Sequence, residues 1–237
     1  MKFAIIAAGE GLRLRQEGVK ESKPLVCING EPLIDRLIRI FRKQDASEIV
    51  VIINDHMLDV AEHLYHLQQV HTTENLCPLT VLRKNTPSSM HSFYETSRYL
   101  ETEPFCLTTV DTVFQEEDFR KYIAAFLSYT GDALMAVTDF IDDEKPLYVA
   151  TASDMTITGF YDAPNGCNYI SGGIYCLKPS AMPALYSCIS EGQSHMRNFQ
   201  RRLIADGLKV HAYCFPKILD IDHLDDIIKA QDFLKVK

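Results

Sequence analysis

The chain has 237 residues, of which 46% are hydrophobic and 24% charged, and its formal net charge is −8 at pH 7. This length suits one large domain, and we expect a single domain over residues 1–237. The negative charge argues against a nucleic-acid or membrane-surface partner, because phosphate backbones and anionic lipids favour broad basic surfaces. Seven scattered cysteines without a CxxC pair, together with apolar runs too short for a membrane helix, predict reduced thiols and a cytoplasmic location.

Short apolar runs alternate with helical patterns through the first half of the chain. The runs "KFAIIAA", "EIVVII", "LTVLR" and "PFCLTTV" predict strands, and helices are expected over "PLIDRLIRIFRKQD", about 58–70 and about 91–100. This alternation is typical of a parallel sheet covered by helices on both faces.

The second half has a different pattern. The stretch "PLYVATASDMTITGFYD" predicts an antiparallel hairpin, "NYISGGIYCL" and "KVHAYCF" predict strands, and helices are expected over about 180–206 and "DHLDDIIKAQDFL". We place Asp222 at the N-cap of that last helix. The expected fold class is therefore Rossmann-like α/β: a mixed, mainly parallel sheet flanked by helices, with antiparallel additions in the second half.

Glycines and cations gather directly behind the first predicted strand, in "AIIAAGEGLRLRQEGVKESKPLVCINGEPLI". A dinucleotide fingerprint needs a third glycine at position 14, which is Leu14, and the phosphate-loop signature GxxxxGK[ST] is absent. We interpret the segment as an extended loop whose backbone N–H groups approach an anion while Arg13 and Lys23 close over phosphates. A charged surface loop without a ligand is the alternative.

The same stretch closely resembles the signature of the nucleotidyltransferases (pyrophosphorylases) that make nucleoside-diphosphate sugars and related activated alcohols. The matching residues are Ala7, Ala8, Gly9, Gly11, Arg13, Lys23, Pro24, Leu25, Gly30, Pro32, Leu33 and Ile34. The resemblance implies the nucleotide-diphospho-sugar transferase fold and a nucleoside triphosphate bound at Ala8, Gly9 and Gly11. It also implies that Arg13 and Lys23 are catalytic and neutralise charge on the leaving pyrophosphate.

Carboxylates follow at two places where the family binds a divalent cation. Asp111 ends "FCLTTV", at the edge of a parallel sheet where ligands bind, and "LDIDHLDDI" resembles the family's C-terminal metal-binding element. Mg²⁺ takes one or two protein carboxylates together with substrate phosphates. The resemblance therefore implies Mg²⁺ at Asp111 and at Asp222 or Asp220, of which we favour Asp222. Helix capping or a turn is the alternative role for these aspartates.

Two regions depart from the pattern of the sugar-phosphate members. "NTPSSMHSFYETSRYL" is closer to cytidylyltransferases that act on phosphocholine-like acceptors, which implies that Asn85, Ser88 and Ser89 lie near the base. A capping role is the alternative for the serines. The place where the Glu-Lys-Pro motif of these members would fall is occupied by "YDAPNG". The residues that resemble the acceptor-side strand are Asn168, Ser171, Gly172 and Gly173.

The predicted function is Mg²⁺-dependent transfer of a nucleotidyl group from a nucleoside triphosphate to a small phosphorylated acceptor, with release of pyrophosphate. A sugar-1-phosphate and a phosphorylated alcohol such as phosphocholine both remain open as acceptor, as does the base. The alternative is a catalytically silent, nucleotide- or nucleotide-sugar-binding regulatory subunit of the same fold. The family's pattern of assembly also implies a homo-oligomer.

Overall fold

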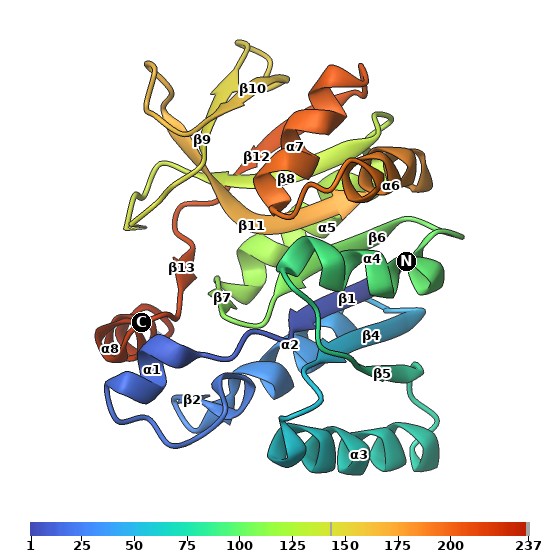
Figure 1. Cartoon of the computed structure of the whole chain (residues 1–237), viewed down its shortest axis with the longest axis vertical. Coiled ribbons are helices and arrows are strands. Elements are labelled where there is room, and N and C mark those ends of the chain that lie inside the picture. The colour runs from blue at the N-terminus through green and yellow to red at the C-terminus, as the bar shows by residue number, and fades with distance from the viewer. Residues whose placement is uncertain (143, 236–237) are drawn as a thin grey trace.

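The computed structural model describes residues 1–142 and 144–235, and a mixed sheet forms its centre (Figure 1). Within this part of the chain the sheet has nine strands in the order β10-β9-β11-β6-β1-β4-β5, and β8 joins it between β11 and β12. The strands are β1 (Lys2–Ala7), β4 (Glu48–Ile53), β5 (Leu79–Arg83), β6 (Phe105–Thr109), β8 (Ala133–Thr138), β9 (Tyr148–Thr151), β10 (Ile157–Tyr161), β11 (Tyr169–Leu177) and β12 (Val210–Cys214).

The N-terminal half of the sheet is parallel, as the alternating sequence pattern predicts. Strand β1 pairs in parallel with β4 on one side and with β6 on the other, so that Ala4 lies opposite both Val50 and Leu107. Strand β5 extends the sheet in parallel beyond β4. Since these strands are buried on both faces, they read as continuous apolar runs in the sequence.

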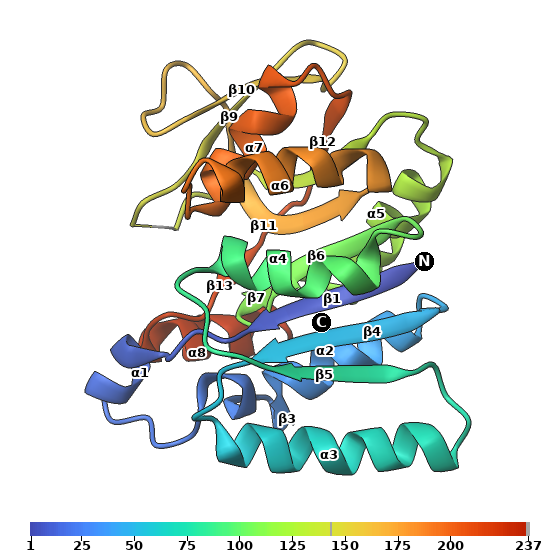
Figure 2. The ribbon, with the colours of Figure 1, turned by 45° about the vertical axis from the view of Figure 1, so that its right-hand side comes forward.

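Helices cover the two faces of the sheet (Figure 2). One apolar cluster lies between the sheet and α2 (Leu33–Arg42), α3 (Leu58–Thr73), α5 (Glu116–Ser128) and α8 (Leu224–Phe233). A second cluster, on the opposite face, includes residues of α4 (Ser89–Leu100), α6 (Met182–Ser190) and α7 (Met196–Ala205). The Rossmann-like mixed α/β fold that the sequence predicts is therefore confirmed.

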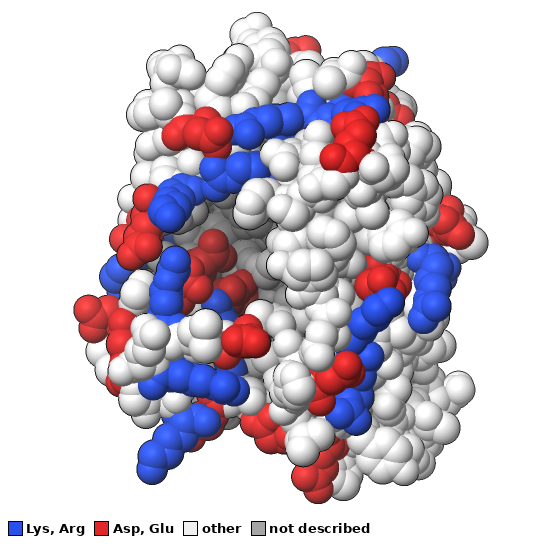
Figure 3. All heavy atoms as spheres, viewed as in Figure 1, with Lys and Arg blue, Asp and Glu red and all other residues white. Residues whose placement is uncertain are grey.

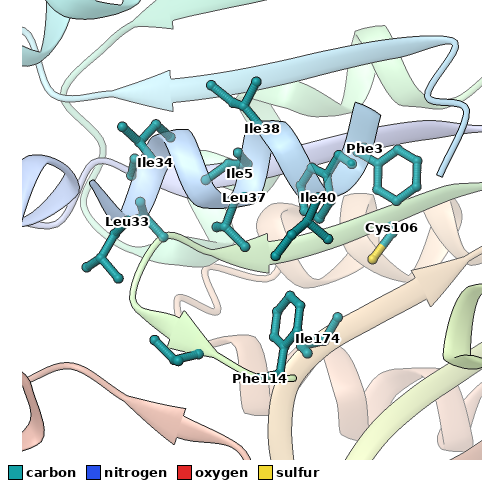
Figure 4. Close-up of a cluster of buried hydrophobic side chains, with 14 of the residues drawn as sticks. Phe3, Ile5, Leu33, Ile34, Leu37, Ile38, Ile40, Cys106, Phe114 and Ile174 are labelled. Carbon is teal, nitrogen blue, oxygen red and sulfur yellow. The ribbon is translucent and has the colours of Figure 1, made fainter. Parts of the chain in front are cut away.

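Strand β1 contributes to both clusters because successive side chains point to opposite faces. Phe3 and Ile5 meet the apolar stripe of α2 in the first cluster (Figure 4), and Ile6 points to the second. The rings of Phe3 and Phe41 stack with their centroids 4.6 Å apart. Each such fully buried side chain stabilises the fold by about 1.5–3 kcal/mol relative to exposure.

The second half of the chain adds the antiparallel strands. Strands β9 and β10 form the expected hairpin, and β11 pairs antiparallel with β6, β8 and β9. The pairing of β11 with β8 shifts register between Ser171 and Tyr175, where Gly173 has a left-handed φ of 72°. This bulge bends β11 just before the residues that pair with the end of β6.

A small two-stranded sheet brings the C-terminal segment back to the centre of the molecule. Strand β13 (Leu219–Asp220) pairs antiparallel with β7 (Thr112–Val113), and the Ile221 amide donates a 3.1 Å hydrogen bond to the Asp111 carbonyl. The chain then enters α8, which lies beside α1 (Leu12–Gln16) in Figure 1. Another short pair, β2 (Cys27–Ile28) with β3 (Glu31–Pro32), precedes α2.

Two local predictions are wrong. The segment interpreted as an extended loop contains the short helix α1 and a 3-10 turn, η1 (Lys23–Leu25), because Gly11 takes a left-handed φ of 62° and Leu14 is buried. The N-cap of α8 is His223 rather than Asp222, because the Asp226 carboxylate accepts hydrogen bonds from both the Asp222 and the His223 amides.

The structure also contains elements that the sequence pattern does not predict. Helix α5 and strand β8 lie in a stretch for which the sequence analysis predicts no element. None of the helices in residues 1–142 and 144–235 is long and apolar enough to cross a membrane.

Candidate active site

Three neighbouring cavities open where β1 and β6 end and β11 begins. The β1 cavity, of about 590 Å³, follows the end of β1; the α8 cavity, of about 510 Å³, lies against the start of α8; and the α7 cavity, of about 280 Å³, lies against α7. They share lining residues at their borders, with Asp222 between the first two and Ser171 between the last two. In Figure 3 the molecule is hollowed on this side, with acidic side chains inside and Lys and Arg around the opening.

The glycine loop forms one wall of the β1 cavity. Ala8, Gly9 and Gly11, predicted to bind the nucleotide, all line it. A Cβ added to Gly11 would lie 3.0 Å from Cβ of Lys23, and the left-handed φ of Gly11 disfavours other residues. Gly11 therefore lets α1 begin and lets the Lys23 side chain pass close to the backbone.

Four charged side chains, which we call the charge cluster, meet at the border of the β1 and α8 cavities: Arg13, Lys23, Asp111 and Asp222. Lys23 Nζ donates hydrogen bonds to Asp111 Oδ2 and, at 2.8 Å, to Asp222 Oδ1. Arg13 donates to the other Asp222 oxygen at 2.9 Å and also lies 3.7 Å from Glu144. The fold thus brings together all four residues that the sequence nominates for catalysis and for the favoured metal pair.

Electrostatics keep the inner part of this cluster ionised. Burial disfavours the charged form of Lys23, but the attraction of Asp111 and then of Asp222 outweighs it and raises the pKa of the lysine. Burial likewise acts to raise the pKa of Asp111, and the charge and hydrogen bond of Lys23 outweigh it and lower that pKa. Both side chains are therefore charged at neutral pH.

Helix α1 is fastened to the N-terminus of α8 by Glu17. One oxygen of Glu17 accepts a 2.6 Å hydrogen bond from the Leu224 amide, and the other lies 2.6 Å from His223 Nδ1. This contact lowers the pKa of Glu17 and raises the pKa of His223. Since Arg13 is on α1 and Asp222 directly precedes His223, Glu17 fixes the two halves of the charge cluster relative to each other.

The carboxylate pair suits a divalent cation. Asp111 and Asp222 converge on one point, and the Lys23 ammonium at that point is a stand-in for a cation. Two carboxylates are the number that Mg²⁺ takes when substrate phosphates complete its shell. No group of three or more His, Cys, Asp or Glu side chains in the described residues is arranged to hold a metal alone. Asp220, the other candidate, lines the α8 and α7 cavities.

The residues predicted to lie near the base divide into two groups. Ser88 and Ser89 line the β1 cavity, and Ser88 also caps α4 by accepting a 3.4 Å hydrogen bond from the His91 amide. Asn85 does not line this cavity: its side-chain oxygen accepts a 3.0 Å hydrogen bond from the Asp55 amide. The capping role and the nucleotide role of Ser88 are compatible in space.

Of the residues predicted to face the acceptor, some line the cavities and one does not. Gly172 lines the α8 cavity, Gly173 the α7 cavity and Ser171 both, whereas Asn168 is exposed ahead of β11 and lies outside both linings. A Cβ on Gly172 would lie 2.3 Å from Ile218 Cδ1. A larger residue there would require the Ile218 side chain, in the C-terminal segment that packs against β11, to shift.

Sequence reasoning missed a neutral polar group in the wall of the α7 cavity. Gln200, only 2% exposed, accepts a 3.0 Å hydrogen bond from the Ser171 hydroxyl and donates one of 3.4 Å to the Tyr175 hydroxyl. Burial raises the pKa of Tyr175 to about 12, so its hydroxyl keeps its proton. A glutamine on the buried stripe of the expected helix was the available signal, because buried amides need partners.

Arg197, which also lines the α7 cavity, was missed as well. It forms an ion pair with Asp162, which Arg201 contacts too at 2.7 Å. One carboxylate shared by two guanidinium groups leaves net positive charge at the rim of this cavity. Nothing in the local sequence around residue 197 distinguishes it from a solvated helix position.

Comparisons with known proteins show what the chain is similar to. The family described as the MobA-like NTP transferase domain matches residues 3–206. The chain is 26% identical over 186 residues to the probable mannose-1-phosphate guanylyltransferase 1 of Oryza sativa subsp. japonica, which covers 77% of this chain and 51% of that protein. It is 21% identical over 236 residues to the glucose-1-phosphate cytidylyltransferase of Salmonella typhimurium, covering 93% and 77%. The chain thus spans about half the length of the rice protein.

Solved structures show the same fold. The inositol-1-phosphate CTP transferase from T. maritima superposes with a TM-score of 0.79 at 18% identity, covering 98% of this chain and 94% of that one. A putative glucose-1-phosphate thymidylyltransferase from Bacillus anthracis gives 0.82 at 17% identity, covering 100% and 96%.

Proposed function

The chain belongs to the MobA-like NTP transferase domain family, and from this premise we propose that it transfers a nucleotidyl group from a nucleoside triphosphate to a small phosphorylated acceptor. The observation that carries the proposal is the charge cluster, where two cations and two carboxylates meet at the border of two cavities. A site that only bound nucleotide would have no need for both carboxylates. Neither the family nor this cluster favours the regulatory alternative.

The triphosphate occupies the β1 cavity in this proposal. Backbone N–H groups of the glycine loop face its phosphates, and Arg13 and Lys23, which line the cavity, neutralise the β- and γ-phosphates. Ser88 and Ser89, at the start of α4, also line this cavity and would contact the nucleoside.

The reaction is an in-line displacement. A phosphate oxygen of the acceptor attacks the α-phosphorus, the bond from the α-phosphorus to its bridging oxygen breaks, and pyrophosphate leaves with that oxygen. Arg13 and Lys23 stabilise the charge that develops on the leaving group, and the fixed positions of both substrates supply much of the remaining acceleration. Asp111 and Asp222 would hold Mg²⁺, which when bound neutralises the α-phosphate and lets an anionic nucleophile approach.

The acceptor occupies the α7 cavity and the adjoining part of the α8 cavity. Gln200, Ser171 and Tyr175 present neutral hydrogen-bonding groups there, which suit the hydroxyl groups of a sugar or polyol. Arg197 supplies positive charge at the rim, and Lys145, from the tripeptide Glu144-Lys145-Pro146 that lies ahead of β9, lines both the α7 and the α8 cavities. Relatives whose names specify mannose-1-phosphate, glucose-1-phosphate and inositol-1-phosphate support an acceptor of this class.

Thermal unfolding with ATP, CTP, GTP and UTP, each with and without Mg²⁺, tests the nucleotide half of the proposal. A ligand that binds only the folded state stabilises it by RT ln(1 + [L]/Kd), about 2.7 kcal/mol at a hundredfold excess over Kd. We expect a metal-dependent increase in Tm for one nucleotide. The same increase in Arg13→Met, a substitution that removes the guanidinium, would contradict its role.

The acceptor half is tested by pyrophosphate release with the nucleotide so identified and a panel of sugar-1-phosphates, inositol-1-phosphate and phosphocholine. We expect turnover with a hydroxyl-rich acceptor and little with phosphocholine. Failure of all four triphosphates to raise the Tm would overturn the transferase proposal.

A further inference from the structure

We propose that Lys23 is the resident counter-ion of the Asp111–Asp222 pair in the nucleotide-free protein, and that it excludes divalent cations from this pair until a triphosphate draws it away. The inference rests on the proposed function, because it takes the β1 cavity as the triphosphate site. Lys23 would then determine when the two carboxylates become available to a divalent cation.

The geometry places the ammonium group where a shared cation would lie. Lys23 Nζ bonds to one oxygen of each aspartate, and its side chain is only 9% exposed. The backbone of Lys23 is fixed in η1, next to Gly11. The lysine therefore reaches the carboxylates from a rigid base with little freedom to swing into bulk water.

The charge of this arrangement opposes a second cation. The Lys23 ammonium is hydrogen-bonded to both Asp111 and Asp222, so a positive charge is held between the two carboxylates. A divalent ion entering between the carboxylates would meet that fixed positive charge at contact distance. Like charges this close in a partly buried site repel strongly, so the ion binds only if Lys23 first moves.

The β1 cavity provides the place to which Lys23 can move. Lys23 lines this cavity as well as contacting the carboxylates, so a triphosphate there offers it phosphate oxygens in exchange for aspartate oxygens. Arg13 can make the same exchange, because it lines the cavity while it is bonded to Asp222. The cations pass from carboxylates to phosphates, and the carboxylates are left for the divalent cation.

This exchange couples two binding events. If the triphosphate increases the affinity of the carboxylates for metal, metal bound there increases the affinity for triphosphate by the same factor. Metal without nucleotide binds weakly because Lys23 competes with it. Nucleotide without metal leaves two uncompensated carboxylates next to its phosphates, and it binds weakly for that reason.

Mn²⁺ titrations followed by electron paramagnetic resonance, with no nucleotide present, test the inference directly. We expect Lys23→Gln, which removes the charge and keeps hydrogen-bonding atoms, to bind Mn²⁺ at least tenfold more tightly than the wild type. Lys23→Arg keeps a cation and should bind as weakly as the wild type. Lys20→Gln removes an exposed lysine from the same segment and should also leave Mn²⁺ affinity unchanged. Equal or weaker binding by Lys23→Gln would overturn the proposal.

A second titration keeps Lys23 unchanged, in case Lys23→Gln does not fold. Without nucleotide, Asp111→Asn should leave Mn²⁺ affinity unchanged, because Lys23 already occupies the site. With a non-hydrolysable triphosphate analogue, the same substitution should weaken it at least tenfold. A clear loss of affinity in the nucleotide-free protein would contradict the inference. These titrations measure Mn²⁺ affinity and not turnover. A result against the inference is therefore distinct from a failure of nucleotidyl transfer.

Discussion

The β1 cavity and the α7 cavity lie next to each other but are built from different chemistry. Charged side chains dominate the border of the β1 cavity, where Lys23 and Arg13 are paired with aspartates. In the α7 cavity the buried polar group is neutral, with Gln200 bonded to Ser171 and Tyr175. The first can exchange partners when a charged ligand arrives, whereas the second offers fixed donors and acceptors.

The two cavities suit the two proposed substrates in different ways. A triphosphate carries most of its charge in one place, so exchange of ion pairs can drive its binding and its chemistry. An uncharged ring of hydroxyl groups is distinguished by hydrogen bonds, because unpaired buried groups are costly. We therefore expect substitutions in the charge cluster to lower kcat and substitutions around Gln200 to raise the KM of the acceptor.

Asp111→Asn should have the largest effect. It removes one of the two carboxylates of the charge cluster while Lys23 keeps its bond to Asp222, so the fold remains but kcat should fall about 10³-fold. Pyrophosphate release under saturating substrates measures this. Asp45→Asn, at an exposed turn where asparagine tolerates the positive φ, is the matched control and should have normal turnover. An Asp111→Asn protein within tenfold of wild type would refute the catalytic assignment.

Gln200→Leu should have an intermediate effect and act on one substrate only. An acceptor hydroxyl that bonds to this network would lose a buried partner on binding, at a cost of about 1–3 kcal/mol, which corresponds to a rise of roughly 5- to 150-fold in the acceptor KM. The KM of the nucleotide should not change. Gln193→Leu, outside the three cavities, is the control. Equal changes in both KM values would show that the two cavities are not independent.

Substitution of Glu116, whose ion pairs lie away from the three cavities, should have the smallest effect. Glu116 bonds to Arg39 and Lys43, and chiefly the Arg39 contact lowers its pKa to about 2. Because this folded-state pKa is below the ordinary value of 4.5, the pair stabilises the protein fully above about pH 4.5 and loses that contribution as the pH falls towards 2. Glu116 is 38% exposed, so the contribution is at most about 1 kcal/mol.

Thermal unfolding of Glu116→Gln from pH 7 to pH 2 measures this contribution. The Tm difference from wild type should be largest near neutral pH and vanish in acid, and Glu62→Gln should show no such convergence. A difference that grew as the pH fell would contradict the pKa shift.

The sequence singles out more of the residues that line the β1 cavity than of those that line the α7 cavity, for a physical reason. Ala8, Gly9, Gly11 and Arg13 are neighbours in sequence and in space, because a loop behind one strand forms the wall of the β1 cavity. The parallel strands were likewise predictable, since burial on both faces makes each one a continuous apolar run. Family and fold class, both carried by these local patterns, are confirmed by the comparisons.

The α7 cavity is assembled from residues that meet only after folding. Ser171 and Gln200 are separated by 29 positions and join because α7 packs over β11. No local pattern contains that information. The same holds for Asn85, which lies outside the lining of the β1 cavity and accepts a hydrogen bond from the Asp55 amide. The cap of α8 was misassigned because Asp222 and His223 are adjacent and both suit the position; the place of the Asp226 carboxylate decides between them.

The return of the C-terminal segment to the first loop has a consequence for synthesis. Arg13 and Asp222 are 209 positions apart, so at about 5–20 residues per second the ribosome adds the second of them roughly 10–40 seconds after the first. Until then α1 lacks the contact of Glu17 with Leu224, and Lys23 lacks one of its two carboxylates. The nascent protein can form β1, β4 and β6 early, yet the charge cluster is completed only after Asp222 has been added.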